Sequence, residues 1–317
     1  MNNFNQNFAY VRKLIYLIVV ISNGGGLQTV SASEPPLLSL NMGFTSGTLY
    51  DVDLNDALAA QETWVRSILQ QINQNKLEVE VKTVAYANVS AIAEAIKKNE
   101  IDAIIVLPLE YLALRDEVSI KPIITSHSAD DAGDRYVIVT HQQNNIQTIE
   151  QLQSHSLMIT IKGSNEVPKI WLETILLEKA LPPCETFFGA INRVSKTTQA
   201  ILPVFFKQAD VCLVPKTDLD IAMTLNPQLK SNLQIIQQSP GYNHIIICVQ
   251  NSFYEKYANL HNDVIEVANR TKQGQQLSTL FRISRLSRFE EAHLDNVKKL
   301  VQTYQRLSKT SIFPQKN

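Results

Sequence analysis

Short loops rich in hydroxyl and amine side chains are the parts of this sequence best suited to bind a ligand. Each lies between an apolar run typical of a strand and an amphipathic run typical of a helix. Their candidate ligand-binding residues are Thr45, Ser46, Tyr111, Lys162, Ser164, Asn165, Ser195, Lys196 and Thr197. Hydroxyl and ammonium groups donate hydrogen bonds, and the free N–H groups at the start of a helix attract anions. We therefore expect a site for a small polar, anionic ligand, although any one of these loops is also typical of an ordinary helix cap.

Motifs for catalysis and for metal binding are absent from the sequence. It has no HExxH, GxSxG or GxxxxGK motif, and its six histidines and three cysteines show no metal-ligand spacing. We therefore expect a binding protein without a cofactor or a metal, and not an enzyme. The alternative is an enzyme on the same fold, such as a lyase or a cofactor-precursor synthase, which would need a titratable group in the binding cleft. Glu110 and Lys162 are the best candidates for that group by their loop positions.

The composition is that of a globular protein with one large or two medium cores. The 317 residues are 44% hydrophobic and 19% charged, with a formal net charge of -1. Binding to nucleic acid would need a positive surface, which this charge balance does not provide. The one notable basic cluster, Arg282, Arg285 and Arg288, is interpreted as the solvated face of a helix. Cys212 and Cys248 lie in strand-like apolar runs, so we expect buried free thiols, with a disulfide between them as the alternative.

The first 32 residues have the pattern of a cleavable signal peptide. Arg12 and Lys13 precede an apolar run at 14–21, and small residues follow up to Ala32. This run is shorter than the roughly 20 apolar residues that cross a bilayer, although a membrane-anchoring helix is the alternative. No cysteine lies near the cleavage site, which argues against a lipid-anchored form. We expect an exported protein that is free outside the cytoplasm.

Apolar and amphipathic runs alternate along the rest of the chain, which is the pattern of βαβ units in a mostly parallel sheet. The expected strands are 37–42, 78–84, 101–107, 136–140, 157–161, 210–215, 233–236 and 244–249. The expected helices include 55–71, a segment capped by Ser90, a segment opened by Ser195, and most of the last sixty residues. Pro203 should kink or break the helix that Ser195 opens.

The alternation divides into two α/β lobes. Two polar, turn-rich stretches at 126–135 and 239–243 separate the apolar runs and are the expected linkers. Because the chain then crosses between lobes twice, residues 37–126 and 243–317 form the first expected lobe, and residues 135–238 form the second. Ligands bind at the carboxyl ends of strands in open α/β sheets, so the candidate loops should face the cleft between the lobes.

The order of these segments resembles the periplasmic phosphonate/phosphate-type substrate-binding proteins of ABC importers. The most specific parts of the resemblance are ADVCLV at 209–214 and QQSPGYN at 237–243, and it extends over most of the chain after the leader. The resemblance implies a type II periplasmic-binding-protein fold, in which two α/β lobes close over a solute and deliver it to a membrane permease. A membrane sensor is the alternative partner, and we expect the protein to be a monomer.

Three loops depart from the pattern of that family. The Ser/Thr/Gly-rich anion loop is replaced by IKGSN at 161–165, and the tyrosine-glycine-rich turn is replaced by LPLE at 107–110. The family's histidine at the start of the next helix is replaced by Ser195 or Lys196. These departures argue against phosphonate itself, although Lys162 and Lys196 can compensate electrostatically for lost hydrogen bonds to an anion. The resemblance still implies an anionic ligand that is phosphonate- or phosphate-like.

Overall fold

The computed structural model describes residues 37–48, 54–74, 78–127, 133–243, 245–257, 260–272, 274–275, 278, 283–309 and 312. The predicted signal peptide lies outside these residues, as do Arg282 and His244. Within the described ranges, no helix combines the length and the apolar character needed to cross a membrane.

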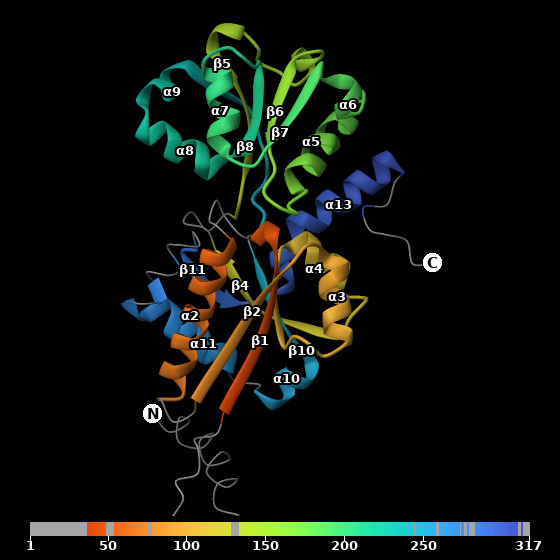
Figure 1. Ribbon diagram of the computed structural model, residues 1–317. Helices are drawn as coiled ribbons and strands as arrows, with labels where there is room; N and C mark the ends of the chain where they lie inside the picture. Colours follow the sequence, from red (N-terminus) through yellow and green to blue (C-terminus); the bar gives the residue numbers. More distant parts are fainter. Residues whose placement is uncertain are drawn as a thin grey trace, which may run out of the picture. The chain divides into compact units, whose positions relative to one another are not determined.

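The first sheet has six strands in the order β11-β4-β10-β3-β1-β2 (Figure 1). Its strands are β1 (Leu37–Thr45), β2 (Glu78–Tyr86), β3 (Ala103–Val106), β4 (Ile120–His127), β10 (Ile246–Gln250) and β11 (Arg285–Arg288). Strands β1, β2 and β3 are parallel, whereas β10 runs antiparallel to both β3 and β4. Strand β10 therefore returns from a distant part of the sequence to complete the sheet.

Helices cover both faces of this sheet. Side chains alternate along a strand, so Ala103 and Ile105 of β3 belong to one apolar cluster and Ile104 and Val106 to another. The first cluster packs against α2 (Leu54–Ile72), α10 (Asn251–Lys256) and α11 (Leu260–Arg270). The second packs against α3 (Val89–Lys97), α4 (Pro108–Leu114) and α13 (Asp295–Ser308). Burial on both faces explains why β3 reads as a nearly continuous apolar run.

The second sheet has five strands in the order β7-β6-β8-β5-β9. Its strands are β5 (Tyr136–His141), β6 (Ser156–Thr160), β7 (Ala190–Val194), β8 (Val211–Pro215) and β9 (Leu233–Gln238). Strand β6 is parallel to β7 and β8, and β5 is antiparallel to β8 and β9. Both sheets are thus mixed, so the expectation of mostly parallel sheets is wrong, while the predicted α/β class with two sheets is confirmed.

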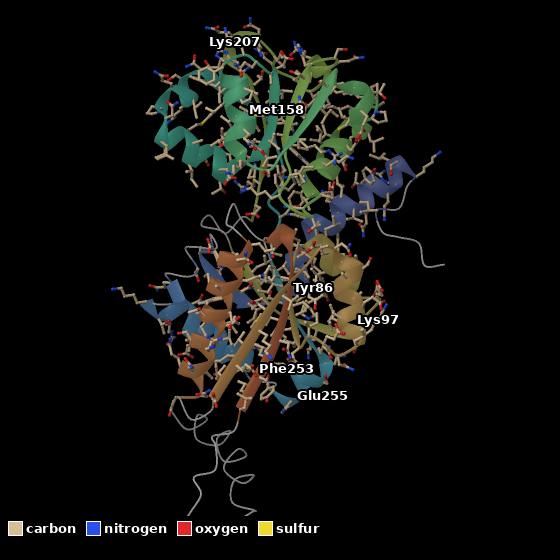
Figure 2. The ribbon with its side chains drawn as sticks, in the orientation of Figure 1. Tyr86, Lys97, Met158, Lys207, Phe253 and Glu255 are labelled. Atoms are coloured by element: carbon tan, nitrogen blue, oxygen red, sulfur yellow. The ribbon has the colours of Figure 1, made fainter. Side chains whose placement is uncertain are left out.

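The second sheet is also covered on both faces. One face packs against α5 (Val167–Glu178) and α6 (Cys184–Phe187), and the other against α7 (Thr197–Phe205), α8 (Lys216–Leu225) and α9 (Pro227–Asn232). Figure 2 labels Met158 on β6, which packs against the apolar cluster that α7 helps to form. It also labels Phe253 on α10, a helix that packs against the first sheet. Short 3-10 turns complete the described elements: η1 (Ser46–Thr48), η2 (Gln142–Asn144), η3 (Glu150–Leu152) and η4 (Glu291–Leu294).

Several local predictions need correction. Arg285 and Arg288 lie on a strand, β11, and not on a helix face, because buried Leu286 between them pairs β11 with β4. Asn88 caps α3 in place of Ser90, since its side chain accepts a hydrogen bond from the Ala91 N–H. Pro203 lies inside α7, which continues to Phe205. A proline in the last turn removes one hydrogen bond without dividing a longer helix.

The three cysteines are buried free thiols. Cys212 lies on β8 of the second sheet and Cys248 on β10 of the first, so the alternative of a disulfide between them is not realised. Burial raises the pKa of both thiols, which keeps them protonated and unreactive.

Candidate functional site

Glu110 is the centre of a buried polar network at the edge of the first sheet. It lies in the first turn of α4 and is only 5% exposed. Its Oε2 atom accepts hydrogen bonds from Thr45 Oγ1 at 2.7 Å and from the Leu107 N–H at 2.8 Å. A carboxylate is favoured in the first turn of a helix, where backbone N–H groups are free. Glu110 thereby ties the carboxyl end of β1 to the start of α4.

Ser164 joins this network from the loop that follows β6. Its hydroxyl donates to Glu110 Oε1 at 2.6 Å and accepts from the Gly47 N–H at 3.2 Å. A Cβ atom on Gly47 would lie 2.6 Å from Ser164 Oγ and 3.1 Å from the Asn165 nitrogen, so only glycine allows this approach. We call Thr45, Gly47, Leu107, Glu110 and Ser164 the Glu110 network. It connects loops that follow strands of both sheets.

The charge of Glu110 is set by two opposing effects. Burial raises the pKa of Glu110 above its ordinary value of 4.5, and the hydrogen bonds from Ser164, Thr45 and Leu107 offset part of that rise. All three of these partners donate to the carboxyl group, which therefore acts as an acceptor on both oxygens.

Lys162 is paired with a buried carboxylate. Its Nζ lies 2.8 Å from Asp218 Oδ2, and the two side chains are 11% and 7% exposed. The same oxygen accepts a hydrogen bond of 2.6 Å from Thr197 Oγ1. We call Lys162, Thr197 and Asp218 the Asp218 cluster; it joins the loop after β6 to the first turns of α7 and α8. The positive charge of Lys162 is thus compensated within the protein.

The same edge of the second sheet also has polar groups that are suitable for binding an anion. Thr160 is the last residue of β6 and is 2% exposed, yet its hydroxyl has no hydrogen-bond partner within the described part of the chain. Helix α7 begins after Lys196, whose side chain does not cap it. Ser195 and Lys196 are exposed. A buried hydroxyl and the N-terminus of a helix are suitable partners for an anion.

Asn165 has a structural role at the start of α5. Its Oδ1 accepts from the Val167 N–H at 3.2 Å, and its Nδ2 donates to the Tyr136 hydroxyl at 2.9 Å. Together with Leu107 and Tyr242 these residues line a small pocket of about 10 Å³. A pocket of that size holds about one water molecule, so it is too small for a solute.

Of the predicted residues, Tyr111 lies in the apolar core and Ser46 lies in the η1 turn. The ring of Tyr111 packs edge-on against Phe289, with 5.8 Å between the centroids, and burial raises its pKa to about 12. It is therefore a core residue, one position along α4 from Glu110. Ser46 opens the η1 turn, and its side chain lies outside the described residues.

The structure brings the predicted residues into two groups that share the loop after β6. Thr45 and Ser164 belong to the Glu110 network, and Lys162 and Thr197 belong to the Asp218 cluster. Sequence reasoning missed the role of Asp218, although an acidic residue in the first turn of a helix after an apolar strand was a usable signal. It also missed Thr160, because a threonine at a strand end carries no distinctive pattern.

Comparison with known proteins identifies the family. Residues 66–297 match the family described as "ABC transporter, phosphonate, periplasmic substrate-binding protein", which covers more than half of the chain. No curated protein matches the sequence.

Solved structures of similar fold include periplasmic binding proteins of ABC transporters. XAC2383 from Xanthomonas citri, described with bound ATP, has a TM-score of 0.64 at 12% identity and covers 86% of this chain and 98% of its own. The binding component of an ABC phosphonate transporter from Pseudomonas aeruginosa has a TM-score of 0.62 at 14% identity, covering 87% of this chain and 88% of its own. PhnD1 from Prochlorococcus marinus, in complex with methylphosphonate, has a TM-score of 0.60 at 15% identity, covering 86% and 99%. The fold and the family match together show that this chain belongs to the phosphonate-type periplasmic substrate-binding proteins of ABC transporters.

Proposed function

We propose that this protein binds a small anionic solute of the phosphonate or phosphate class between its two lobes and delivers it to an ABC permease. The lobes are residues 37–126 with 243–317, and residues 135–238. The observation that supports this proposal best is the Glu110 network, in which Ser164 of the second sheet's loop contacts both Gly47 and Glu110 of the first. Loops that follow the carboxyl ends of strands in both sheets thus meet. Ligands of open α/β sheets lie at the carboxyl ends of strands.

The anion would be held mainly by the second lobe. Lys196 supplies an exposed charge at the start of α7, and the free N–H groups of that helix and the Thr160 hydroxyl supply donors. Lys162 contributes less than its charge suggests, because Asp218 is already its partner. The other predicted contacts, Thr45, Ser46, Tyr111, Ser164, Asn165, Ser195 and Thr197, are proposed as the surrounding residues.

The proposal includes the setting in which the protein acts. Cleavage of residues 1–32 would release the mature chain as a monomer into the periplasm, without a lipid anchor. There it would exchange its solute with a permease. A membrane sensor is the alternative partner, and a permease and an ATPase encoded beside this gene would favour transport.

A ligand screen by calorimetry tests the proposal. Methylphosphonate, phosphate, phosphite and methanesulfonate should be titrated into the purified protein, with a neutral amino acid as control. An anion of the proposed class should bind and raise the melting temperature, with a stabilisation of about 2.7 kcal/mol at 100 times its dissociation constant. Binding of the amino acid alone would contradict the proposal.

Thr160→Val separates ligand binding from stability at this site. Valine keeps nearly the same shape and removes a hydroxyl that is buried without a described partner, so the ligand-free protein should be as stable as the wild type or more stable. If the hydroxyl donates to the anion, the dissociation constant should rise by about tenfold. Unchanged affinity would remove Thr160 from the site.

A further inference from the structure

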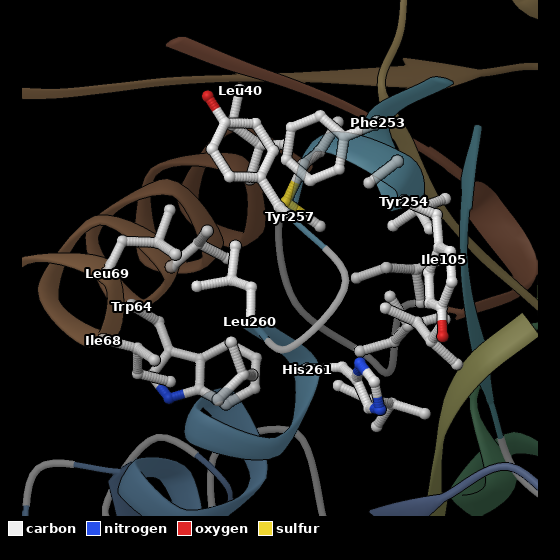
Figure 3. A pocket seen from close by; sticks show the side chains of 18 residues that line it. Leu40, Trp64, Ile68, Leu69, Ile105, Phe253, Tyr254, Tyr257, Leu260 and His261 are labelled. Carbon is white, nitrogen blue, oxygen red and sulfur yellow. The ribbon is translucent and has the colours of Figure 1, made fainter. Parts of the chain in front are cut away.

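A second, apolar cavity lies within the first lobe, between the sheet and helices α2, α10 and α11. Its volume is about 80 Å³. Figure 3 shows side chains arranged around an open centre, with Trp64, Ile68 and Leu69 from α2 on one side and Phe253 and Tyr254 from α10 on another. The sheet contributes Ala103, Ile105 and Ile247 to the described lining.

The cavity is chemically suited to an apolar occupant. None of its described lining residues is Asp, Glu, Lys or Arg. The side-chain nitrogen and oxygen atoms of the described lining belong to Trp64, Tyr254, Tyr257 and His261. A buried water needs two to four polar partners, and apolar cavities stay dry and bind apolar molecules. Since one water-sized group needs about 10 to 15 Å³, the space accommodates an object of about six such groups.

Ala103 explains why the space exists. It lies on β3 directly beside Met42 of β1 and Val249 of β10, so one small side chain stands among larger ones on this face of the sheet. The opposite wall is fixed by aromatic contacts. The Phe253 and Tyr257 rings are 4.7 Å apart, and Lys121 Nζ lies 3.6 Å from the centre of the Tyr254 ring.

We propose that this cavity is a binding site for a small apolar molecule, namely a single aromatic ring or an aliphatic chain of about six heavy atoms. The site is separate from the proposed anion site. It lies on the face of the sheet covered by α2 and α11, and it shares no residue with the Glu110 network or the Asp218 cluster.

Methyl-labelled NMR with benzene and 1-hexanol as probes tests this site directly. Titration of the full protein should shift the δ1-methyl signals of Ile68, Ile105 and Ile247 in a saturable way, because these residues line the cavity. The signals of Ile138 and Ile159, buried in the second sheet, serve as internal controls and should stay in place. Shifts spread over both sheets, or shifts that do not saturate, would overturn the proposal.

Replacing each of two buried alanines by leucine provides a test variant and its matched control. Ala103→Leu places a larger side chain in the cavity, so it should leave the melting temperature equal or raise it, and it should abolish the benzene-induced shifts. Ala93→Leu enlarges a fully buried alanine of α3 in the other apolar cluster, and it should lower the melting temperature by overpacking. An equal loss of stability in both variants, or benzene shifts that persist in Ala103→Leu, would show that the cavity is not the binding site.

Discussion

Among single residues, Asp218 limits the positive charge that Lys162 can offer to the proposed ligand. It is 8% exposed and accepts from both Lys162 Nζ and Thr197 Oγ1. A buried ion pair is costly to break on one side, because the remaining charge loses its partner. Asp218 therefore competes with any anion for Lys162.

Asp218→Asn should expose that competition. We expect it to lower the free energy of unfolding of the ligand-free protein by about 3 kcal/mol and to tighten anion binding, because Lys162 becomes available. Urea denaturation and calorimetry measure the two effects. Asp220→Asn in the same helix is the control, since its ion pair with Lys216 is exposed and should contribute at most about 1 kcal/mol. Weaker anion binding in Asp218→Asn would contradict this account.

Glu110 should make stability depend on pH. Its folded-state pKa is raised above 4.5 by burial, so the folded chain holds the proton more tightly than the unfolded chain. This effect stabilises the fold below pH 4.5 and is lost as the pH rises through the raised pKa. Glu110→Gln cannot titrate, so this fall in unfolding free energy should be missing from its pH profile, measured by urea denaturation. The control is Glu94→Gln, at an exposed position, which should keep the wild-type profile. An unaltered profile in Glu110→Gln would show that Glu110 does not titrate in this pH range.

At the scale of elements, the η1 turn and the loop after β6 depend on each other. Gly47 has no side chain, and this allows Ser164 to reach both its N–H group and Glu110. Ser164 therefore has a structural role as well as a proposed role in ligand binding, because its hydroxyl holds two elements together.

A double-mutant cycle tests this dependence. Gly47→Ala should destabilise the protein by about 1 to 3 kcal/mol, because its Cβ would lie 2.6 Å from Ser164 Oγ. In a Ser164→Ala background the contact of 2.6 Å is gone and the contact of 2.8 Å with Leu107 Cδ1 remains, so the same substitution should cost less. The destabilisation by Gly47→Ala is measured by urea denaturation in both backgrounds. If it is equal in the two, the contact with Ser164 Oγ is not the source of the strain.

The sequence predicts most helices and strands, but not the side-chain contacts among the loops at their ends. Strands such as β3 and β8 are recognisable because both of their faces are buried, which gives continuous apolar runs. Strand β11 is not, since Leu286 is its only fully buried side chain and arginines flank it. The partner of Lys162 could not be predicted either, because Asp218 is 56 positions away and nothing in the local pattern links them.

In the whole molecule, two mixed sheets bring several loops from strand ends together. The chain belongs to a family of substrate-binding proteins of ABC transporters, and we propose that the substrate binds at these loops. The Glu110 network connects the loops of both sheets, while the Asp218 cluster balances charge within one of them. We expect an anion to bind at the start of α7, where Lys196 is exposed and the helix has no side-chain cap.

Calorimetric titration of methylphosphonate and phosphate into the Lys196→Ala variant tests whether an anion binds there. Loss of one charge-assisted hydrogen bond costs about 1.5 to 3 kcal/mol, so affinity for whichever anion the wild type binds should fall at least about tenfold. The melting temperature of the ligand-free protein should not change, because the side chain is exposed. The control is Lys230→Ala, which removes an exposed lysine of α9 and should leave the affinity for the anion unchanged. Wild-type affinity in Lys196→Ala would contradict anion binding at the start of α7.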